Sequence, residues 1–89
     1  MRVALICRDK PGALQTRLDN RAAHLAYIEA TGVVEVGGPL IEDGQMAGSL
    51  LILSVETLAA AQAWAAGDPY AKAGLFASVT INEWKKVIG

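Results

Sequence analysis

The chain is expected to form a single α+β domain over residues 1–89, ferredoxin-like, with the order βαββαβ and a four-stranded antiparallel sheet in the order 4-1-3-2. Three observations predict this fold. Segments of strand and helix character follow one another in that order within 89 residues, a length that builds one core. The first and third strand segments are apolar on both faces, which is typical of central strands. Each of the two helical segments ends at a glycine.

The first strand is expected over Arg2–Arg8, which is apolar on both faces and ends at the turn signature Asp9-Lys10-Pro11-Gly12. A helix is expected over Ala13–Thr31, because its apolar residues recur within roughly an 80° arc at helical spacing. Gly32 follows as the stop. The residues of this apolar stripe, expected to face the core, are Leu14, Leu18, Leu25 and Ile28.

The second strand is expected over Val33–Ile41, broken by Gly37-Gly38-Pro39. Because proline has no N–H for the ladder, this strand is expected at a sheet edge or with a bulge at the proline. Glu42-Asp43-Gly44-Gln45 is a hairpin turn signal. The third strand, Gly48–Val55, is apolar on both faces and is therefore expected at the centre of the sheet.

Thr57 is a good N-cap for a second helix from Leu58 to about Ala66, and the alternation in Phe76–Trp84 predicts the last strand. Two helices can cover only one face of a four-stranded sheet, whereas both central strands are apolar on both faces. The uncovered face is therefore expected to pack against a second copy of the chain, as a homodimer through the sheet face.

The charge and cysteine content exclude several classes of partner. The formal net charge is -1 with both signs mixed, so a nucleic-acid partner is not expected. No apolar run approaches the ~20 residues of a membrane span. The apolar run at the start of the chain is shorter than the hydrophobic region of an export signal, so no such signal is expected. The single cysteine, Cys7, cannot form an internal disulfide, and a reactive thiolate is not expected in a buried strand. The expected location is the cytoplasm.

The first helix carries three polar residues on one side, Arg17, Arg21 and His24, at spacings i, i+4 and i+7. This side overlaps the margin of the apolar stripe. One interpretation is a pocket with an imidazole and guanidinium donors, suited to a carboxylate or phenolate ligand. The alternative is that the arginines extend into solvent and His24 is a hydrogen-bonded residue at the core boundary.

Asp68 also has two interpretations. An aspartate before Pro69 is a standard helix start that Gly74 could end, and such a cap contributes ~1 kcal/mol by itself. Alternatively, the carboxylate accepts a hydrogen bond from one ring nitrogen of His24, which fixes the tautomer and makes the other nitrogen a general base. The local sequence leaves both open.

Other candidates are weaker. Gly38 and Pro39 could let a ligand approach the backbone, and Tyr70 could present a hydroxyl, although a bulge and ordinary packing explain them equally well. One histidine without a cluster of cysteines or carboxylates predicts no metal site. No phosphate-binding glycine motif or nucleophile elbow is present, so no cofactor is expected.

Four stretches resemble the YCII-related family of YciI-like proteins: RDKPGA at Arg8–Ala13, RAAHLAYI at Arg21–Ile28, GGPL at Gly37–Leu40 and DPYAKAGLF at Asp68–Phe76. The resemblance covers essentially the whole chain. It implies a ferredoxin-like domain that dimerises through its sheets into a dimeric α+β barrel. It also implies a cleft in which a histidine and an aspartate meet as an acid–base pair, and His24 and Asp68 occupy those two motif positions. The same group of folds includes muconolactone isomerase-like enzymes, and a dehydrochlorinase of chlorinated hydroxyhydroquinones resembles YCII proteins.

The resemblance therefore favours a small metal-independent acid–base enzyme, of lyase, isomerase or dehydrochlorinase type, acting on a small anionic molecule through His24 and Asp68. Arg17 or Arg21 would hold the anion, and Tyr70, Gly38 and Pro39 would complete the site. One alternative is a non-catalytic ligand-binding or accessory module that uses the same cleft. Another is a purely structural role for both residues.

Overall fold

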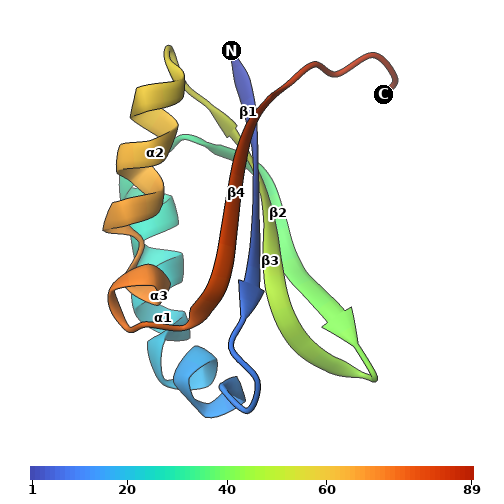
Figure 1. The fold of residues 1–89 in the computed structure, drawn as a ribbon. Coiled ribbons are helices and arrows are strands. Elements are labelled where there is room, and N and C mark those ends of the chain that lie inside the picture. Colours follow the sequence, from blue (N-terminus) through green and yellow to red (C-terminus); the bar gives the residue numbers. More distant parts are fainter.

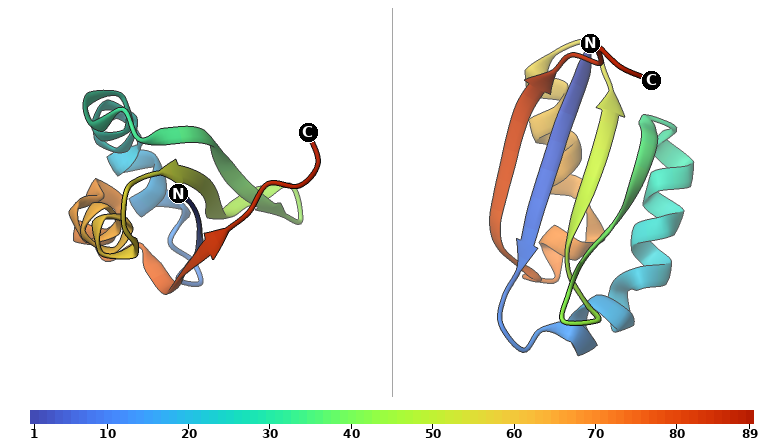
Figure 2. Two further views of the ribbon diagram at one scale, coloured as in Figure 1. Left: turned by 90° about the horizontal axis from the view of Figure 1, so that it is seen from above. Right: turned by 90° about the vertical axis from the view of Figure 1, so that its right-hand side faces the viewer.

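A four-stranded antiparallel sheet with all helices on one of its faces makes up the fold (Figures 1 and 2). The structure is a computed structural model that describes all 89 residues. The elements in chain order are β1 (Arg2–Asp9), α1 (Leu14–Thr31), β2 (Val34–Glu42), β3 (Gln45–Ser54), α2 (Leu58–Gly67), α3 (Pro69–Lys72) and β4 (Phe76–Trp84). The sheet order β2-β3-β1-β4 is the predicted 4-1-3-2 read from the other edge, so the predicted fold class is confirmed.

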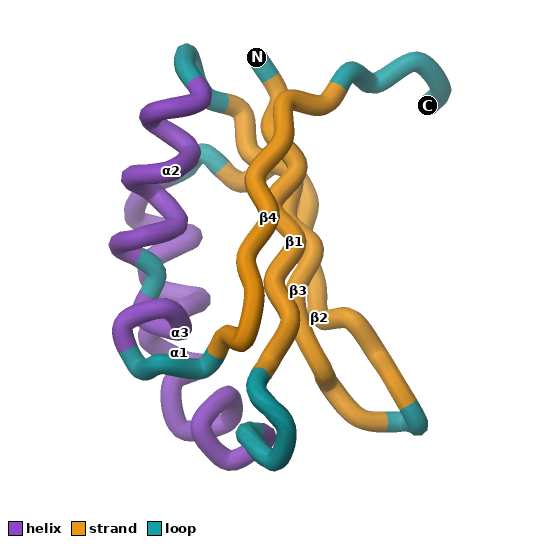
Figure 3. Tube along the Cα trace, in the orientation of Figure 1, coloured by secondary structure: helices purple, strands orange, loops and turns teal.

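The core lies between the sheet and the helices, which form two separate layers in Figure 3. β1 and β3 pair antiparallel, with Leu5 opposite Leu51 on the inner face and Ile6 opposite Leu50 on the outer face. The buried core cluster consists of Val3, Leu5, Cys7, Leu51, Leu53, Ala61 and Trp64. Ile6 and Leu50 remain exposed, because no helix covers the outer face. None of the helices is both long and apolar enough to cross a membrane.

The second strand differs from the prediction in one respect. The expected break at Gly37-Gly38-Pro39 is wrong, because β2 continues through it from Val34 to Glu42. The irregularities of register lie elsewhere, between Val34 and Val36 and between Leu40 and Ile41. The predicted edge position is confirmed, and it explains why the proline is tolerated: a residue without an N–H can sit in an edge strand, where one side of the backbone has no neighbour.

Only part of the apolar stripe of the first helix faces the core, which corrects a second prediction: Ile28 packs against the core, whereas two leucines do not. Leu18 and Leu25 are 46% and 50% exposed, whereas Arg17 and His24 are buried. On a helical wheel, Leu18 and Leu25 lie about 80–100° from the row formed by Arg17, His24 and Ile28. That row faces the sheet, so the predicted arc covers only the margin of the buried face.

Hydrogen bonds from aromatic side chains hold α1 against α2. The Tyr27 hydroxyl donates to the carbonyl oxygen of Trp64 at 2.8 Å, and the Trp64 indole donates to the Thr31 hydroxyl at 2.8 Å. A Cβ atom on Gly67 would lie 2.6 Å from the Tyr27 hydroxyl oxygen, so this close contact requires the glycine that ends α2. The contact positions the second half of α1 beside the residue that follows Gly67, which is Asp68.

Candidate active site

His24 and Asp68, which are 44 residues apart in the chain, meet in the buried layer between α1 and α3. The His24 Nδ1 lies 2.7 Å from the Asp68 Oδ1, and both side chains are almost completely buried. A carboxylate oxygen accepts, so Nδ1 carries the proton and donates it. The other ring nitrogen, Nε2, is then the unprotonated one in the neutral imidazole and can accept a proton.

Asp68 is also the helix cap that the sequence predicted. Its backbone is extended, with φ -61° and ψ 126°, between the end of α2 and the start of α3. Its Oδ1 accepts a hydrogen bond from the backbone N–H of Tyr70 at 3.0 Å. The same oxygen therefore caps α3 and bonds the imidazole of His24, so the cap and the contact with His24 occur together. The cap fixes the carboxylate that orients the imidazole.

Tyr70 links the imidazole to the first arginine of α1. The rings of His24 and Tyr70 stack with centroids 4.0 Å apart and an angle of 17° between their planes. The guanidinium carbon of Arg17 lies 4.7 Å from the centroid of the same phenol ring. Burial raises the pKa of Tyr70, and the positive charge of Arg17 only partly opposes this effect. The phenol is therefore a neutral, rigid platform for the imidazole at neutral pH.

Arg17 is held by two residues that the sequence analysis did not place in the site. Its Nε and Nη2 donate to the two carboxylate oxygens of Asp9 at 2.7 and 2.8 Å, and Nη2 also donates to the Ser49 hydroxyl at 2.9 Å. Burial by itself lowers the pKa of Arg17, but the hydrogen bonds and the charge of Asp9 outweigh it, so the pKa is raised. Arg17 is thus a charge neutralised by Asp9, with only Nη1 left to donate.

Signals for these two missed residues exist in the sequence, although they are faint. Asp9 opens the turn signature after the first predicted strand, where a charged residue is ordinary, yet its side chain is only 6% exposed. Ser49 is one of two serines in the mainly apolar run GSLLILSV, and its hydroxyl accepts a hydrogen bond from Arg17 on the inner face. A polar residue on the buried face of a central strand needs a partner, and this is the signal that could have identified Ser49.

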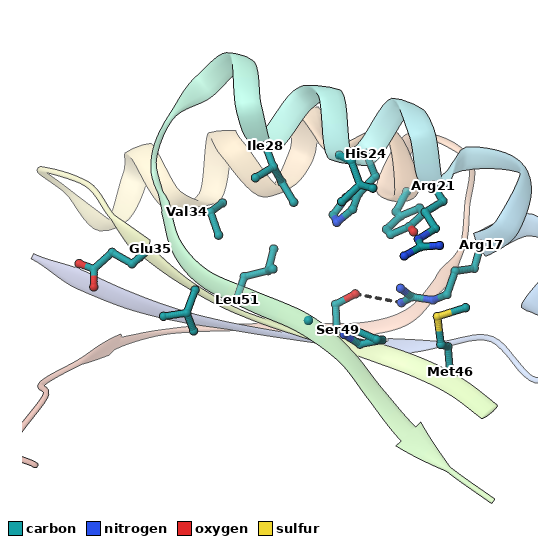
Figure 4. Close-up of a pocket in the computed structure, with 15 residues that line it drawn as sticks. Arg17, Arg21, His24, Ile28, Val34, Glu35, Met46, Ser49 and Leu51 are labelled. Atoms are coloured by element: carbon teal, nitrogen blue, oxygen red, sulfur yellow. Dashed lines mark hydrogen bonds between the residues drawn. The ribbon is translucent and has the colours of Figure 1, made fainter. Parts of the chain in front are cut away.

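A cavity of about 410 Å³ lies between α1 and the strands β2 and β3 (Figure 4). Six of the seven predicted site residues line it: Arg17, Arg21, His24, Tyr70, Gly38 and Pro39. Asp68, the seventh, does not line the cavity and bonds the imidazole of His24 instead. Arg21 is exposed and makes no ion pair, so it is the cation of the cavity whose charge no carboxylate neutralises. No group of three or more metal-ligating side chains is present.

The Cys7 thiol is expected to resist alkylation in the folded protein. Burial raises the pKa of Cys7 from 9.0 to about 12, and the negative charge of Asp68 adds to the effect. At pH 8, iodoacetamide should modify Cys7 only after unfolding in urea, as measured by intact mass. Between pH 9.0 and about 12 the thiol ionises only in the unfolded chain, so the free energy of unfolding should fall as the pH rises through this range. Rapid modification of the native protein would contradict the burial.

Comparisons with known proteins identify the family of the chain. Residues 1–85 match the YCII-related domain. The chain is 35% identical to Protein YciI of Escherichia coli O6:H1 in an alignment of 100 positions, gaps included, that covers 98% of this chain and 99% of that protein. Among solved structures, one similar protein is the 5-chloro-2-hydroxyhydroquinone dehydrochlorinase TftG from Burkholderia phenoliruptrix AC1100, in complex with 2,5-dihydroxybenzoquinone. It is 40% identical, with a TM-score of 0.87, and the match covers 96% of this chain and 94% of that chain.

A more distant match concerns the fold alone. An antibiotic biosynthesis monooxygenase is 12% identical with a TM-score of 0.61, and the match covers 98% of each chain. At this identity the similarity carries no information on substrate or reaction. The domain match and the full-length identity to YciI do carry the assignment to a family. The chain belongs to the YCII-related domain family.

Proposed function

We propose that the protein is a metal-independent proton-transfer enzyme, of lyase, isomerase or dehydrochlorinase type, that acts on a small anionic ring molecule. The observation that carries the proposal is the 2.7 Å contact between His24 Nδ1 and Asp68 Oδ1 beside a cavity that His24 lines. An imidazole whose Nδ1–H is held by a carboxylate has Nε2 available as a general base. The similarity to a dehydrochlorinase supports this type of reaction.

Each residue has a defined part in the proposed reaction. Nε2 of His24 takes a proton from the substrate, and the Asp68 carboxylate stabilises the imidazolium that forms. In an elimination, the electron pair released by the departing proton forms the new double bond while chloride leaves with the electrons of its bond to carbon. Arg21, whose charge is not neutralised by a carboxylate, attracts the anionic substrate and stabilises negative charge on its ring oxygens.

The test is an assay with 5-chloro-2-hydroxyhydroquinone, the compound in the name of the similar dehydrochlorinase. Chloride release above the rate without protein is expected, together with a change in the ultraviolet spectrum of the ring. A ring that binds and is recovered unchanged would contradict the proposal for this substrate class. That result would favour the second function that the cleft allows, a non-catalytic ligand-binding or accessory module. The cytoplasmic location expected from the sequence stays a prediction.

We also propose that the outer face of the sheet packs against a second copy of the chain. Its exposed apolar residues are Ile6, Leu50, Val36 and Trp84. The accessible surface of 5392 Å² exceeds the about 5,000 Å² expected for a monomer of this mass. Residues after Trp84 leave the sheet on the side away from the helices (Figures 1 and 2), with Val87 and Ile88 exposed. These features support a dimer through the sheet.

Replacing Leu50 with aspartate is expected to convert the dimer into a monomer, because a charge on the packed face would be buried without a partner. Leu50→Asp and the wild type would be compared by sedimentation velocity. Leu18→Asp is the control, since Leu18 is similarly exposed but lies on α1 in the opposite layer. A wild-type protein that sediments as a monomer at micromolar concentration would overturn the dimer proposal.

A further inference from the structure

We infer that the cavity takes an amphipathic ring anion, with the planar anionic ring at His24 and Arg21 and an uncharged apolar substituent lying along Ile28, Val34 and Leu51. This inference rests on the proposed function for the position of the ring. It goes beyond the proposed function by specifying the class of ligand, since proton transfer at His24 does not by itself require an apolar substituent. Three properties of the cavity support it.

The two ends of the cavity differ in chemistry (Figure 4). Arg21, His24 and Ser49 lie at one end, and Ile28, Val34 and Leu51 lie together toward the other. On α1 the wall changes from the polar His24 to the apolar Ile28 over one turn, about 6 Å along the helix axis. On β3 the wall changes from the polar Ser49 to the apolar Leu51 over two residues, about 7 Å along the strand. Both walls therefore change from polar to apolar over a similar distance.

The cavity is longer than one ring. Its helical wall runs from Arg17 to Ile28, a rise of about 16 Å along α1. The volume of about 410 Å³ falls in the range of roughly 300–1,000 Å³ that is typical of pockets for ligands larger than a single ring. A ring placed against His24 occupies one part of this length. The rest of a matching ligand lies against the apolar walls.

The far end of the cavity supplies no unpaired charge. Glu35 lines the cavity there, and both of its carboxylate oxygens accept hydrogen bonds from the Arg2 Nε at 2.9 and 3.0 Å. The two opposite charges offset one another, so this end of the cavity supplies no unpaired charge that would bind a charged substituent. Leu25, half exposed on the same helix, forms part of the wall between the two ends. The substituent that fits these neighbours is uncharged and apolar.

The test measures the affinity of the intact protein for 2,5-dihydroxybenzoquinone and for derivatives that carry a methyl, propyl or pentyl group on the ring. Isothermal titration calorimetry is suitable, since it needs no turnover. Each added methylene is expected to lower the Kd roughly three- to fourfold, which is the effect of burying one methylene. An alkyl alcohol of the same length without the ring should not bind, because it lacks the anion.

Two substitutions on α1 form a matched pair of controls. Leu25→Asn removes apolar wall and is expected to reduce the gain per methylene. Leu18→Asn is equally exposed on the same helix but does not line the cavity, so the series should be unchanged. Both positions are half exposed, and neither variant should lose its fold.

The outcomes separate this inference from the proposed function. A parent ring that binds while the substituents bring no gain in affinity overturns the inference and leaves the proposed function intact. A gain that is identical in Leu25→Asn and Leu18→Asn also overturns it, because the alkyl group then binds elsewhere on the molecule. A gain that depends on Leu25, in a protein that releases no chloride, supports the inference and counts against the proposed function. Failure of every compound to bind counts against both.

Discussion

Alanine in place of His24 is expected to lower kcat/KM for chloride release by about 10²–10⁴-fold, the usual contribution of a positioned general base. The imidazole is the candidate base of the cavity, because its Nδ1 donates to Asp68 and its Nε2 is left free to accept a proton from the substrate. The fold should survive, since α1 is also held through the hydrogen bonds of Tyr27 and Thr31, which do not involve His24. Circular dichroism and urea unfolding would verify this.

The Asp68 variants divide the role of the carboxylate into charge and geometry. The Tyr70 N–H and the His24 Nδ1 both bond the Oδ1 of Asp68, so the amide oxygen of an asparagine can keep both hydrogen bonds. Asp68→Asn then removes the charge alone. A hydrogen bond to a charged partner exceeds a neutral one by about 1–1.5 kcal/mol, so kcat/KM should fall about tenfold. Asp68→Ala also loses the cap and the orientation, and its loss should approach that of His24→Ala.

Asp19→Asn is the control for these variants, because Asp19 is exposed on α1 and accepts a hydrogen bond only from the nearby Gln15. Its kcat/KM should equal that of the wild type. The ¹⁵N chemical shifts of the imidazole would report the tautomer, with the proton on Nδ1 in the wild type and in Asp68→Asn. Unchanged turnover in both His24→Ala and Asp68→Ala would rule out the pair as the catalytic group and leave it a structural one.

Local patterns were sufficient to predict the fold but only part of the candidate site. Strands apolar on both faces gave the central positions of β1 and β3, because period-two alternation and burial are properties of a short segment. The contact between His24 and Asp68 joins residues 44 positions apart, and no local pattern distinguishes a cap from a partner of an imidazole. The resemblance of the two motifs to a known family identified the pair, and the geometry now brings the two side chains together.

The remaining errors have a common physical cause, namely that burial depends on how an element is rotated and placed in the fold. The apolar arc of α1 is real, but the helix turns the Arg17–His24 row toward the sheet instead. Asp9 and Ser49 acquire their role only because β1, β3 and α1 converge on one guanidinium. Each residue alone has an ordinary explanation. Their joint effect is a network that only tertiary structure creates.

That network leads to the largest expected effect on stability. Asp9→Ala should lower the free energy of unfolding by about 3–5 kcal/mol, because it leaves the Arg17 guanidinium buried without its carboxylate. A domain of 89 residues has a total stability of about 4–13 kcal/mol, so the loss would be a large part of it. Urea denaturation at constant ionic strength measures the change. Glu42→Ala is the matched control, since the ion pair between Arg8 and Glu42 is exposed and should contribute less than about 1 kcal/mol.

The double variant Asp9→Leu/Arg17→Met tests why the protein keeps this pair. Replacing a buried ion pair by apolar groups of similar volume is often neutral for stability, so the double variant should unfold near the wild-type urea concentration. It also removes the donor to Ser49 and the cation beside Tyr70, and affinity for 2,5-dihydroxybenzoquinone should fall about tenfold. Restored stability with weakened binding would mean that the pair organises the floor of the cavity. If Asp9→Ala costs no more than Glu42→Ala, water reaches Arg17 and the network is not a buried one.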